Sequence, residues 1–307
     1  MVSGEPAAAA AGGVLGMPSL PLFLSQLFNG LAMGTLLALV STGLTIILGT
    51  LGVLNFAHGA LFMVGAYAGY VVMGHTHSFV LAMASGALVV LVLGVILERG
   101  LVRLYYSRPP EDQILMTFGV GIVIVEVIRL IFGGLSQRVS HPTWGNGVVQ
   151  MGFLIYPKYR LLVLIIIAVT LLLLYVLLYR TRLGLIVRAG IEDDLMVGML
   201  GINVKKTFLA VFGLGAAAAG FAGVIYSPIV SVAPDMGATV LVQSFVVVVI
   251  GGLGSFPGAI VGGLIAGEIL SLTSMFNPAY SQVMLYLAMA LVLVLRPQGL
   301  FGVEGRE

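Results

Sequence analysis

Charged side chains are scarce in this chain: lysine, arginine, aspartate and glutamate make up only 8% of its 307 residues, whereas hydrophobic residues make up 60%. A water-soluble domain could not hydrate so apolar a surface, so we expect an all-α polytopic membrane protein surrounded by lipid. Cysteine is absent, which excludes disulfides and thiolate sites. The chain also lacks a phosphate-binding P-loop, a nucleophile elbow and a zinc motif. We therefore expect neither an enzyme nor a bound cofactor, and no nucleic-acid partner.

Long apolar runs predict eight or nine membrane helices. The run at 240–252 is short for a full crossing, so a re-entrant segment is an alternative there. Residues 1–21 and 303–307 are expected to be mobile tails on either side of a transmembrane domain of residues 22–302. The expected helices cover residues 22–48, a segment ending near 73, 79–97, 114–132, 161–179, 208–226, 240–252, 258–274 and 281–295.

Two interruptions of the apolar pattern resemble each other: ILGTLGVLNFAHG from Ile47 and VIGGLGSFPG from Val249. This similarity is typical of a two-fold internal repeat, with chance similarity in glycine-rich sequence as the alternative. A broken helix leaves backbone groups unpaired, which is tolerated at membrane depth only beside protein or a wet cavity. The breaks are therefore candidate linings of a translocation path, or else ordinary cytoplasmic turns. The candidate residues are Asn55, Phe56, His58, Gly254 and Ser255, together with Glu268 in the helix that follows.

The most charged interval is the loop of residues 180–206, in which five cations flank three adjacent acids. Apolar runs long enough to span a bilayer precede and follow it, so the loop joins two membrane helices on one side of the membrane. Apolar residues within it recur at the spacing of a helical face, the acids from Glu192 to Asp194 fall in the expected first turn, and Gly201 supplies a C-terminal stop. The pattern predicts a short amphipathic helix over about 190–201. This helix either rests on the membrane surface or docks a soluble partner.

Positive charges are unevenly distributed if this loop is cytoplasmic and the segments alternate across the membrane. Ten lysines and arginines then fall in cytoplasmic segments, and three (Arg138, Lys158 and Arg160) fall outside. The excess predicts an N-terminus outside and a C-terminus in the cytoplasm. Residues 133–160 and 227–238 would then build the outer face.

Few charged or metal-binding side chains interrupt the expected helices. Glu126 and Arg129 are three residues apart and are predicted to pair on one helix face. Glu268 has no partner in its own helix and follows small residues spaced four apart, so it faces either a polar cavity or a neighbouring subunit. His75 and His77 have no acid or cysteine nearby, so we expect an exposed outer turn rather than a metal site.

Four motifs follow one another along the chain: NFAHG, RAGIEDDLMVGMLGINVKK, GGLGSFPGAIVGG and RPQGLFG. With these motifs the chain resembles the branched-chain amino acid ABC permease family, specifically its LivH-type subunits, over about residues 22–302. The resemblance implies a bacterial inner-membrane importer with a second, LivM-like permease. It also implies two LivG/LivF-like ATPases that bind ATP and magnesium, and a periplasmic substrate-binding protein.

The resemblance further implies that the helix near 190–201 couples this chain to an ATPase, whose groove would contact Glu192, Asp193 and Leu200-Gly201. Transport would then proceed by alternating access driven by the ATPases. Related systems carry urea, short amides and other small carboxylates as well as leucine, isoleucine and valine, so the solute stays open. The full set of expected coupling residues is Arg188, Gly190, Glu192, Asp193, Leu195, Met199, Leu200 and Gly201.

Two other classes of transporter are alternatives on the residues alone. An ion-coupled secondary transporter would use Glu126 or Glu268 as its proton or cation site. A passive solute channel would need neither an ATPase nor a binding protein.

Overall fold

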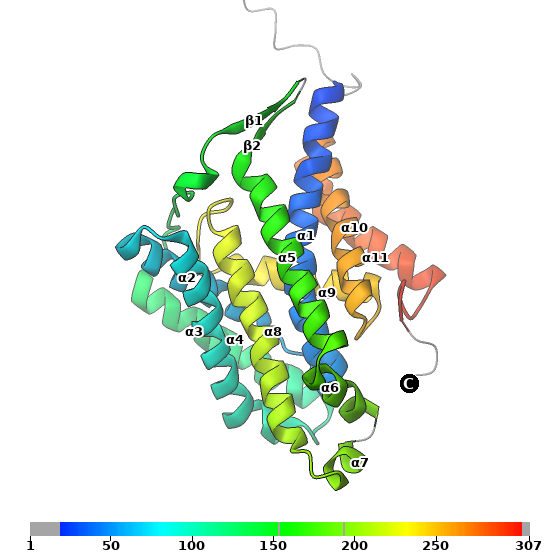
Figure 1. Ribbon diagram of the computed structural model, residues 1–307. Coiled ribbons are helices and arrows are strands. Elements are labelled where there is room, and N and C mark those ends of the chain that lie inside the picture. The colour runs from blue at the N-terminus through cyan, green and yellow to red at the C-terminus, as the bar shows by residue number, and fades with distance from the viewer. Residues whose placement is uncertain (1–18, 153, 193, 303–307) are drawn as a thin grey trace, which may run out of the picture.

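Helices make up most of the computed structural model, which describes residues 19–152, 154–192 and 194–302 (Figure 1). A two-stranded antiparallel hairpin, β1 (Val148–Met151) and β2 (Leu154–Pro157), pairs Val149 with Tyr156. The α-helices are α1 (Leu20–Leu51), α2 (His58–Thr76), α3 (Phe79–Gly100), α4 (Pro110–Phe132), α5 (Lys158–Arg180), α6 (Arg182–Glu192), α7 (Asp194–Met199), α8 (Val204–Tyr226), α9 (Met236–Gly251), α10 (Phe256–Phe276) and α11 (Ser281–Leu295). Short 3₁₀ helices are η1 (Val102–Tyr105), η2 (Thr143–Gly145) and η3 (Pro278–Tyr280).

All nine apolar segments expected from the sequence are helical. Within the described residues, seven helices are long and apolar enough to cross a membrane: α1, α3, α4, α5, α8, α10 and η3 with α11. The expected number of eight or nine is thus confirmed for seven, because α2 and α9 are not among them. The expected tails lie almost wholly outside the described residues, and α1 already begins at Leu20.

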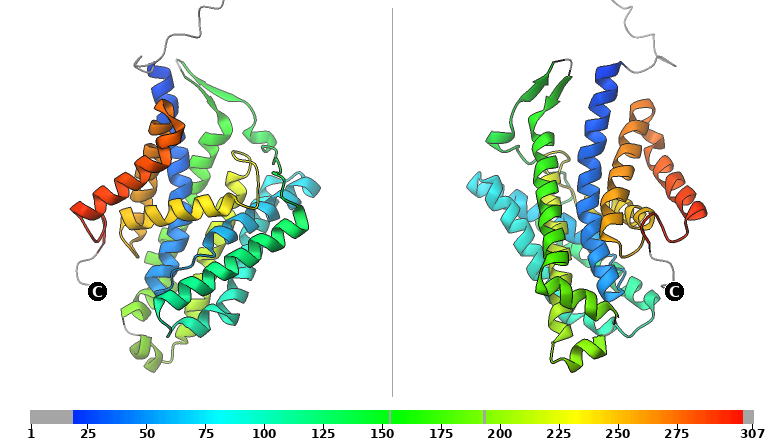
Figure 2. Two further views of the ribbon diagram at one scale, coloured as in Figure 1. Left: turned by 180° about the vertical axis from the view of Figure 1, so that it is seen from behind. Right: turned by 45° about the vertical axis from the view of Figure 1, so that its right-hand side comes forward.

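Helix α1 is the centre of the bundle. It is apolar on every side, as suits a helix that is surrounded by other helices or by lipid. Its residues from Leu36 to Thr45 are all buried, and α5, α8, α9 and α10 pack around it (Figure 2). Helix α9 runs crosswise to α1, whereas α10 lies alongside it.

Glycines let the helices touch backbone to backbone, as their spacing predicts. A Cβ atom on Gly267 of α10 would lie 2.3 Å from the Cα of Gly34 in α1, a distance that no real side chain tolerates. Gly65 of α2 and Gly220 of α8 meet in the same way, again at 2.3 Å. The small residues therefore fix how closely α1, α2, α8 and α10 approach.

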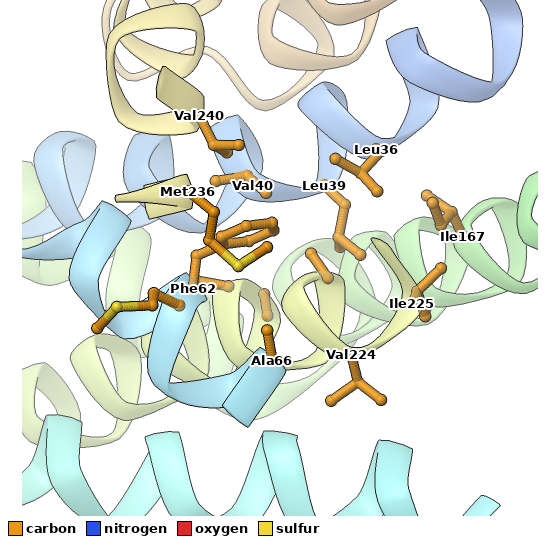
Figure 3. Packing of buried hydrophobic residues seen from close by; sticks show 14 of the residues in the cluster. Leu36, Leu39, Val40, Phe62, Ala66, Ile167, Val224, Ile225, Met236 and Val240 are labelled. Atoms are coloured by element: carbon orange, nitrogen blue, oxygen red, sulfur yellow. The ribbon is translucent and has the colours of Figure 1, made fainter. Parts of the chain in front are cut away.

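The main hydrophobic core lies where α1, α2, α5, α8 and α9 meet (Figure 3). Phe62 of α2 and Met236 of α9 sit side by side at its middle, flanked by Val40 of α1. Phe62 also contacts the ring of Tyr226, with the ring centroids 6.0 Å apart. This core ties the crosswise helix α9 to the central helix.

The two ends of the bundle differ. The beginning of α1 and the hairpin lie at one end, whereas α6 and α7 lie at the other (Figure 1). We call these the hairpin end and the α6–α7 end. At the hairpin end, Gln137 and Val232 exchange two backbone hydrogen bonds of 2.8 Å, which join the two segments expected to build one face.

Candidate functional site: the α6–α7 end and the helix breaks

The charged loop becomes helical earlier than the helix expected over 190–201. α6 begins at Arg182 and its bounds run to Glu192, so Glu192 does not lie in a first turn; α7 covers Asp194–Met199. The apolar face of α6 begins earlier than predicted, because Gly184, Val187 and Gly190 are already buried at spacings of three. The predicted stop at Gly201 is confirmed: it has a φ of +80°, and its N–H donates to the carbonyl of Gly198 at 3.0 Å.

The expected coupling residues divide into an outer and an inner set. Met199 and Leu200 are 82% and 73% exposed, and Gly201 beside them is exposed too. Gly190 is buried against the ring of Phe208 in α8, 3.7 Å from where its Cβ would be. Asp193 and the side chains of Glu192 and Leu195 lie outside the described residues.

Arg188 connects α6 to the neighbouring helices. Its guanidinium lies over the ring of Tyr179, 5.3 Å from the centroid, and donates a hydrogen bond to the carbonyl of Leu178 at the end of α5. Tyr179 in turn meets Phe256, the first residue of α10, at 6.0 Å between centroids. Arg188 thus contacts α5 directly, and Tyr179 connects it to the start of α10.

A small cavity of about 90 Å³ opens between α1, α5, α6 and the turn before α10. Arg188 and Gly254 both line it, so the structure brings together one expected coupling residue and one expected path residue. Gly254 has a φ of +76°, and a Cβ on Gly49 of α1 would lie 3.0 Å from its Cα. Ser255 caps α10, since its Oγ accepts from the N–H of Gly258 at 3.1 Å.

The first break, between α1 and α2, is held by side chains rather than open to a path. Asn55 is only 1% exposed, and its Oδ1 accepts from the N–H of Ala57 at 3.1 Å. The N–H of Phe56 donates to Thr117 Oγ1 of α4 at 3.1 Å. His58 is fully buried, with Nε2 3.1 Å from the carbonyl oxygen of Val40. A lining role for Asn55, Phe56 and His58 stays a prediction.

Glu268 lies in the middle of α10, over Gly30 of α1. One of its carboxylate oxygens is buried without a hydrogen-bond partner among the described residues. Beside it an open groove of about 490 Å³ is lined almost entirely by apolar side chains of α10 and by Met284 of α11. The six expected path residues therefore do not share one cavity.

The remaining expected polar residues lie where the sequence places them. Glu126 and Arg129 form an ion pair on the exposed face of α4, as predicted. His75 lies in the last turn of α2 and His77 directly follows that helix, and both are exposed.

Two of the four sequence motifs, RPQGLFG and GGLGSFPGAIVGG, contact each other in the structure. The closing RPQGLFG segment folds back so that the N–H groups of Leu300 and Phe301 donate to Ile250 and Gly251 at the end of α9, both at 2.9 Å. Gly299, with a φ of +80°, lies so close to Gly252 that a Cβ would be 2.6 Å from its backbone. The C-terminal segment thus braces the turn that precedes α10.

Two polar clusters were missed from the sequence. Glu98, fully buried at the end of α3, accepts from Arg103 Nε and Nη2 at 3.1 and 2.9 Å and from the Tyr106 hydroxyl at 2.7 Å. Burial, with the nearby Glu98 carboxylate, raises the pKa of Tyr106 well above its usual range. The other cluster includes Asn29 and Arg160 at the hairpin end. One feature of the sequence could have indicated this second cluster: Gln26 and Asn29 are two amide residues, three positions apart, in an otherwise apolar helix.

The sequence of this chain is similar to known proteins over most of its length. The family described as branched-chain amino acid transport system, permease component, matches residues 26–293. The high-affinity branched-chain amino acid transport system permease protein LivH of Salmonella typhimurium is 31% identical over 296 residues, which cover 91% of this chain and 96% of that protein. The corresponding permease BraD of Pseudomonas aeruginosa is 29% identical over 93% of this chain and 98% of its own length. LivM of Escherichia coli is 26% identical over 85% and 67%. No solved structure matches.

Proposed function

This chain belongs to the branched-chain amino acid permease family of ABC transporters, and on that premise we propose that it imports its solute together with a second permease and two ATPases. It is a multi-pass membrane protein and the permease component of such a system, a kind of subunit that does not itself hydrolyse ATP. Family membership decides against the ion-coupled and channel alternatives.

The partners follow from the relatives. Because both LivH and LivM resemble this chain, a LivM-like protein is the proposed second permease. LivG/LivF-like ATPases would bind ATP and magnesium, and a periplasmic binding protein would deliver the solute. Leucine, isoleucine and valine are the proposed solutes, in keeping with the names of the relatives.

The exposed apolar tip of α7 is the observation that supports ATPase docking at the α6–α7 end. Met199 and Leu200 expose most of their side chains at the α6–α7 end, within the loop of residues 180–206 that carries most of the charge in its part of the chain. Apolar side chains gathered at one protruding tip are typical of a surface that another protein covers. This end would therefore face the cytoplasm, with the N-terminus outside, as the distribution of lysine and arginine predicts.

Alternating access would begin with movement of α6 and α7 when the ATPases close. The contacts of Arg188 with Tyr179, and of Tyr179 with Phe256, would carry that movement to α10. The contact of Gly190 with Phe208 would carry it to α8. Loop 180–206 is thus the proposed coupling loop within the permease domain.

The second break supports two further parts of the proposal. Helix α9 has 16 residues and an axial length of about 24 Å, short of the ~30 Å hydrocarbon layer, so we assign it as re-entrant. The breaks at 52–57 and 252–255 both begin at a glycine with positive φ and both lie near the end of α1. They would be corresponding parts of an internal repeat.

A charge placed on the α7 tip tests the docking surface. Leu200→Glu should abolish co-purification of the ATPases and ATP-driven uptake, because a carboxylate would be buried unpaired in the interface. The matched control is Leu104→Glu, which alters a 66% exposed leucine in η1, outside α6 and α7. Normal ATPase association of the Leu200→Glu protein would show that the tip is not the docking surface.

A further inference from the structure

A polar cavity of about 390 Å³ opens at the hairpin end, between α1, α5, α8 and α10. Its volume is in the range of small-molecule sites. It lies at the opposite end of α1 from the cavity of about 90 Å³ that Arg188 and Gly254 line, and it shares no residue with the helix breaks. Gln26, Asn29, Arg160, Ser271 and Ser274 form its polar side.

Arg160 gives the cavity an unbalanced positive charge. Among the described residues, no acidic side chain lines the cavity and Arg160 takes part in no ion pair. It lies in the first turn of α5, where the positive end of the helix dipole adds to its charge, and no side chain caps that end. A guanidinium has five N–H donors in a planar fork that suits a carboxylate.

The polar side is held in position by its own hydrogen bonds. Asn29 Oδ1 accepts from Arg160 and, at 3.0 Å, from the hydroxyl of Tyr156 in β2. Ser271 of α10 donates to the backbone and side-chain oxygens of Gln26, at 2.7 and 2.9 Å. Arg160 is therefore oriented by an amide that satisfies one of its donors and leaves its charge uncompensated.

The rest of the cavity lining is largely apolar. Leu36 and Leu270 are almost fully buried at its lining, and Ala32, Met33 and Ile229 lie beside them. One cavity thus combines a cation, amide and hydroxyl oxygens, and branched aliphatic side chains. A zwitterionic amino acid with an apolar side chain presents the complementary groups.

We propose that this cavity binds the transported amino acid, with its carboxylate on Arg160 and its aliphatic side chain against Leu36 and Leu270. The hydroxyl oxygen of Ser274, whose own proton goes to the carbonyl of Ser271, would accept from the α-ammonium group. This assignment rests on the proposed import direction, in which solute arrives at the hairpin end. Because no described acidic residue lines the cavity, the carboxylate is the group of the solute that the site would bind most strongly.

Two substitutions test the site in the complete transporter, reconstituted in proteoliposomes with leucine-loaded binding protein. Arg160→Gln removes the charge and keeps a shorter side chain that can still donate a hydrogen bond. Asn29→Asp keeps the shape and the two accepted hydrogen bonds, and it neutralises Arg160 from within the cavity. We expect each to lower leucine uptake at least tenfold, with basal ATP hydrolysis and assembly within twofold of wild type.

The matched control is Lys158→Gln, which removes a positive charge from the same turn of α5 but outside the cavity, and it should leave uptake unchanged. A structural role for the cluster predicts normal uptake by Asn29→Asp, because an ion pair between the introduced carboxylate and Arg160 would hold α1 and α5 together at least as well. Full uptake by either variant, or failure of both to assemble, would overturn the proposed site. If the wild-type complex took up no leucine with ATP present, the importer itself would be wrong.

Discussion

Removing Arg103 should destabilise the protein strongly, because it would strand a buried carboxylate. The Glu98 side chain is completely buried, and its two oxygens receive the two hydrogen bonds of the Arg103 fork. Breaking a buried ion pair from one side costs about 3–5 kcal/mol. Arg103 is itself 29% exposed and Tyr106 would still donate to Glu98, so we expect Arg103→Ala to lower the free energy of unfolding by about 3 kcal/mol.

The measurement is equilibrium unfolding in mixed detergent micelles, followed by circular dichroism. Arg99→Ala is the control, since Arg99 is an exposed arginine at the end of the same helix and should change stability by less than about 0.5 kcal/mol. The double variant Glu98→Gln/Arg103→Ala should be more stable than Arg103→Ala alone, because no charge is left unpaired. A loss of less than about 1 kcal/mol for Arg103→Ala, as at a surface pair, would refute the reasoning.

Two further predictions concern the helix contacts. Gly267→Ala should destabilise the fold by about 1–3 kcal/mol in the same unfolding assay, because its Cβ would press on the backbone of Gly34. The control is Gly119→Ala, which should be neutral or stabilising because the structure leaves open space there. Equal losses of stability at both sites would contradict the close contact. Tyr179→Ala should leave ATPase association intact while lowering ATP-driven uptake several-fold, because it removes the ring between Arg188 and Phe256. Unchanged uptake in proteoliposomes would exclude this route of coupling.

Helices could be predicted from the sequence because a membrane helix is defined by its own residues. Apolar length alone locates α5 and α8, and the structure extends each by only a few residues at the polar ends. The start of α4 is an example: hydropathy begins it near 114, whereas Glu111 and Asp112 belong to its first turn, where they complement the helix dipole. Hydropathy detects the part of a helix in lipid and not the turns beyond it.

The sites could not be predicted in the same way, because they depend on contacts between distant segments. Asn29 and Arg160 are 131 residues apart, and the position of Arg160 in the loop pattern suggested only an outer positive charge. The early start of α6 was missed for a local reason: the three adjacent acids suit a helix start, yet the buried face of Gly184, Val187 and Gly190 already makes the preceding residues helical. Burial of that face outweighed the preference of Glu192 for a first turn.

Helices α1 and α10 line both cavities, which bears on how the two ends could communicate. At the hairpin end they contribute Asn29 and Ser271, and at the α6–α7 end Thr50 and Phe256. Between these ends their backbones touch at Gly34, so a shift of one displaces the other. Coupling between distant sites requires an element whose position both sites influence. The α1–α10 pair is the element we propose for this role: a tilt driven through Phe256 would change the distance between Ser271 and Arg160, and with it the shape of the proposed amino-acid site.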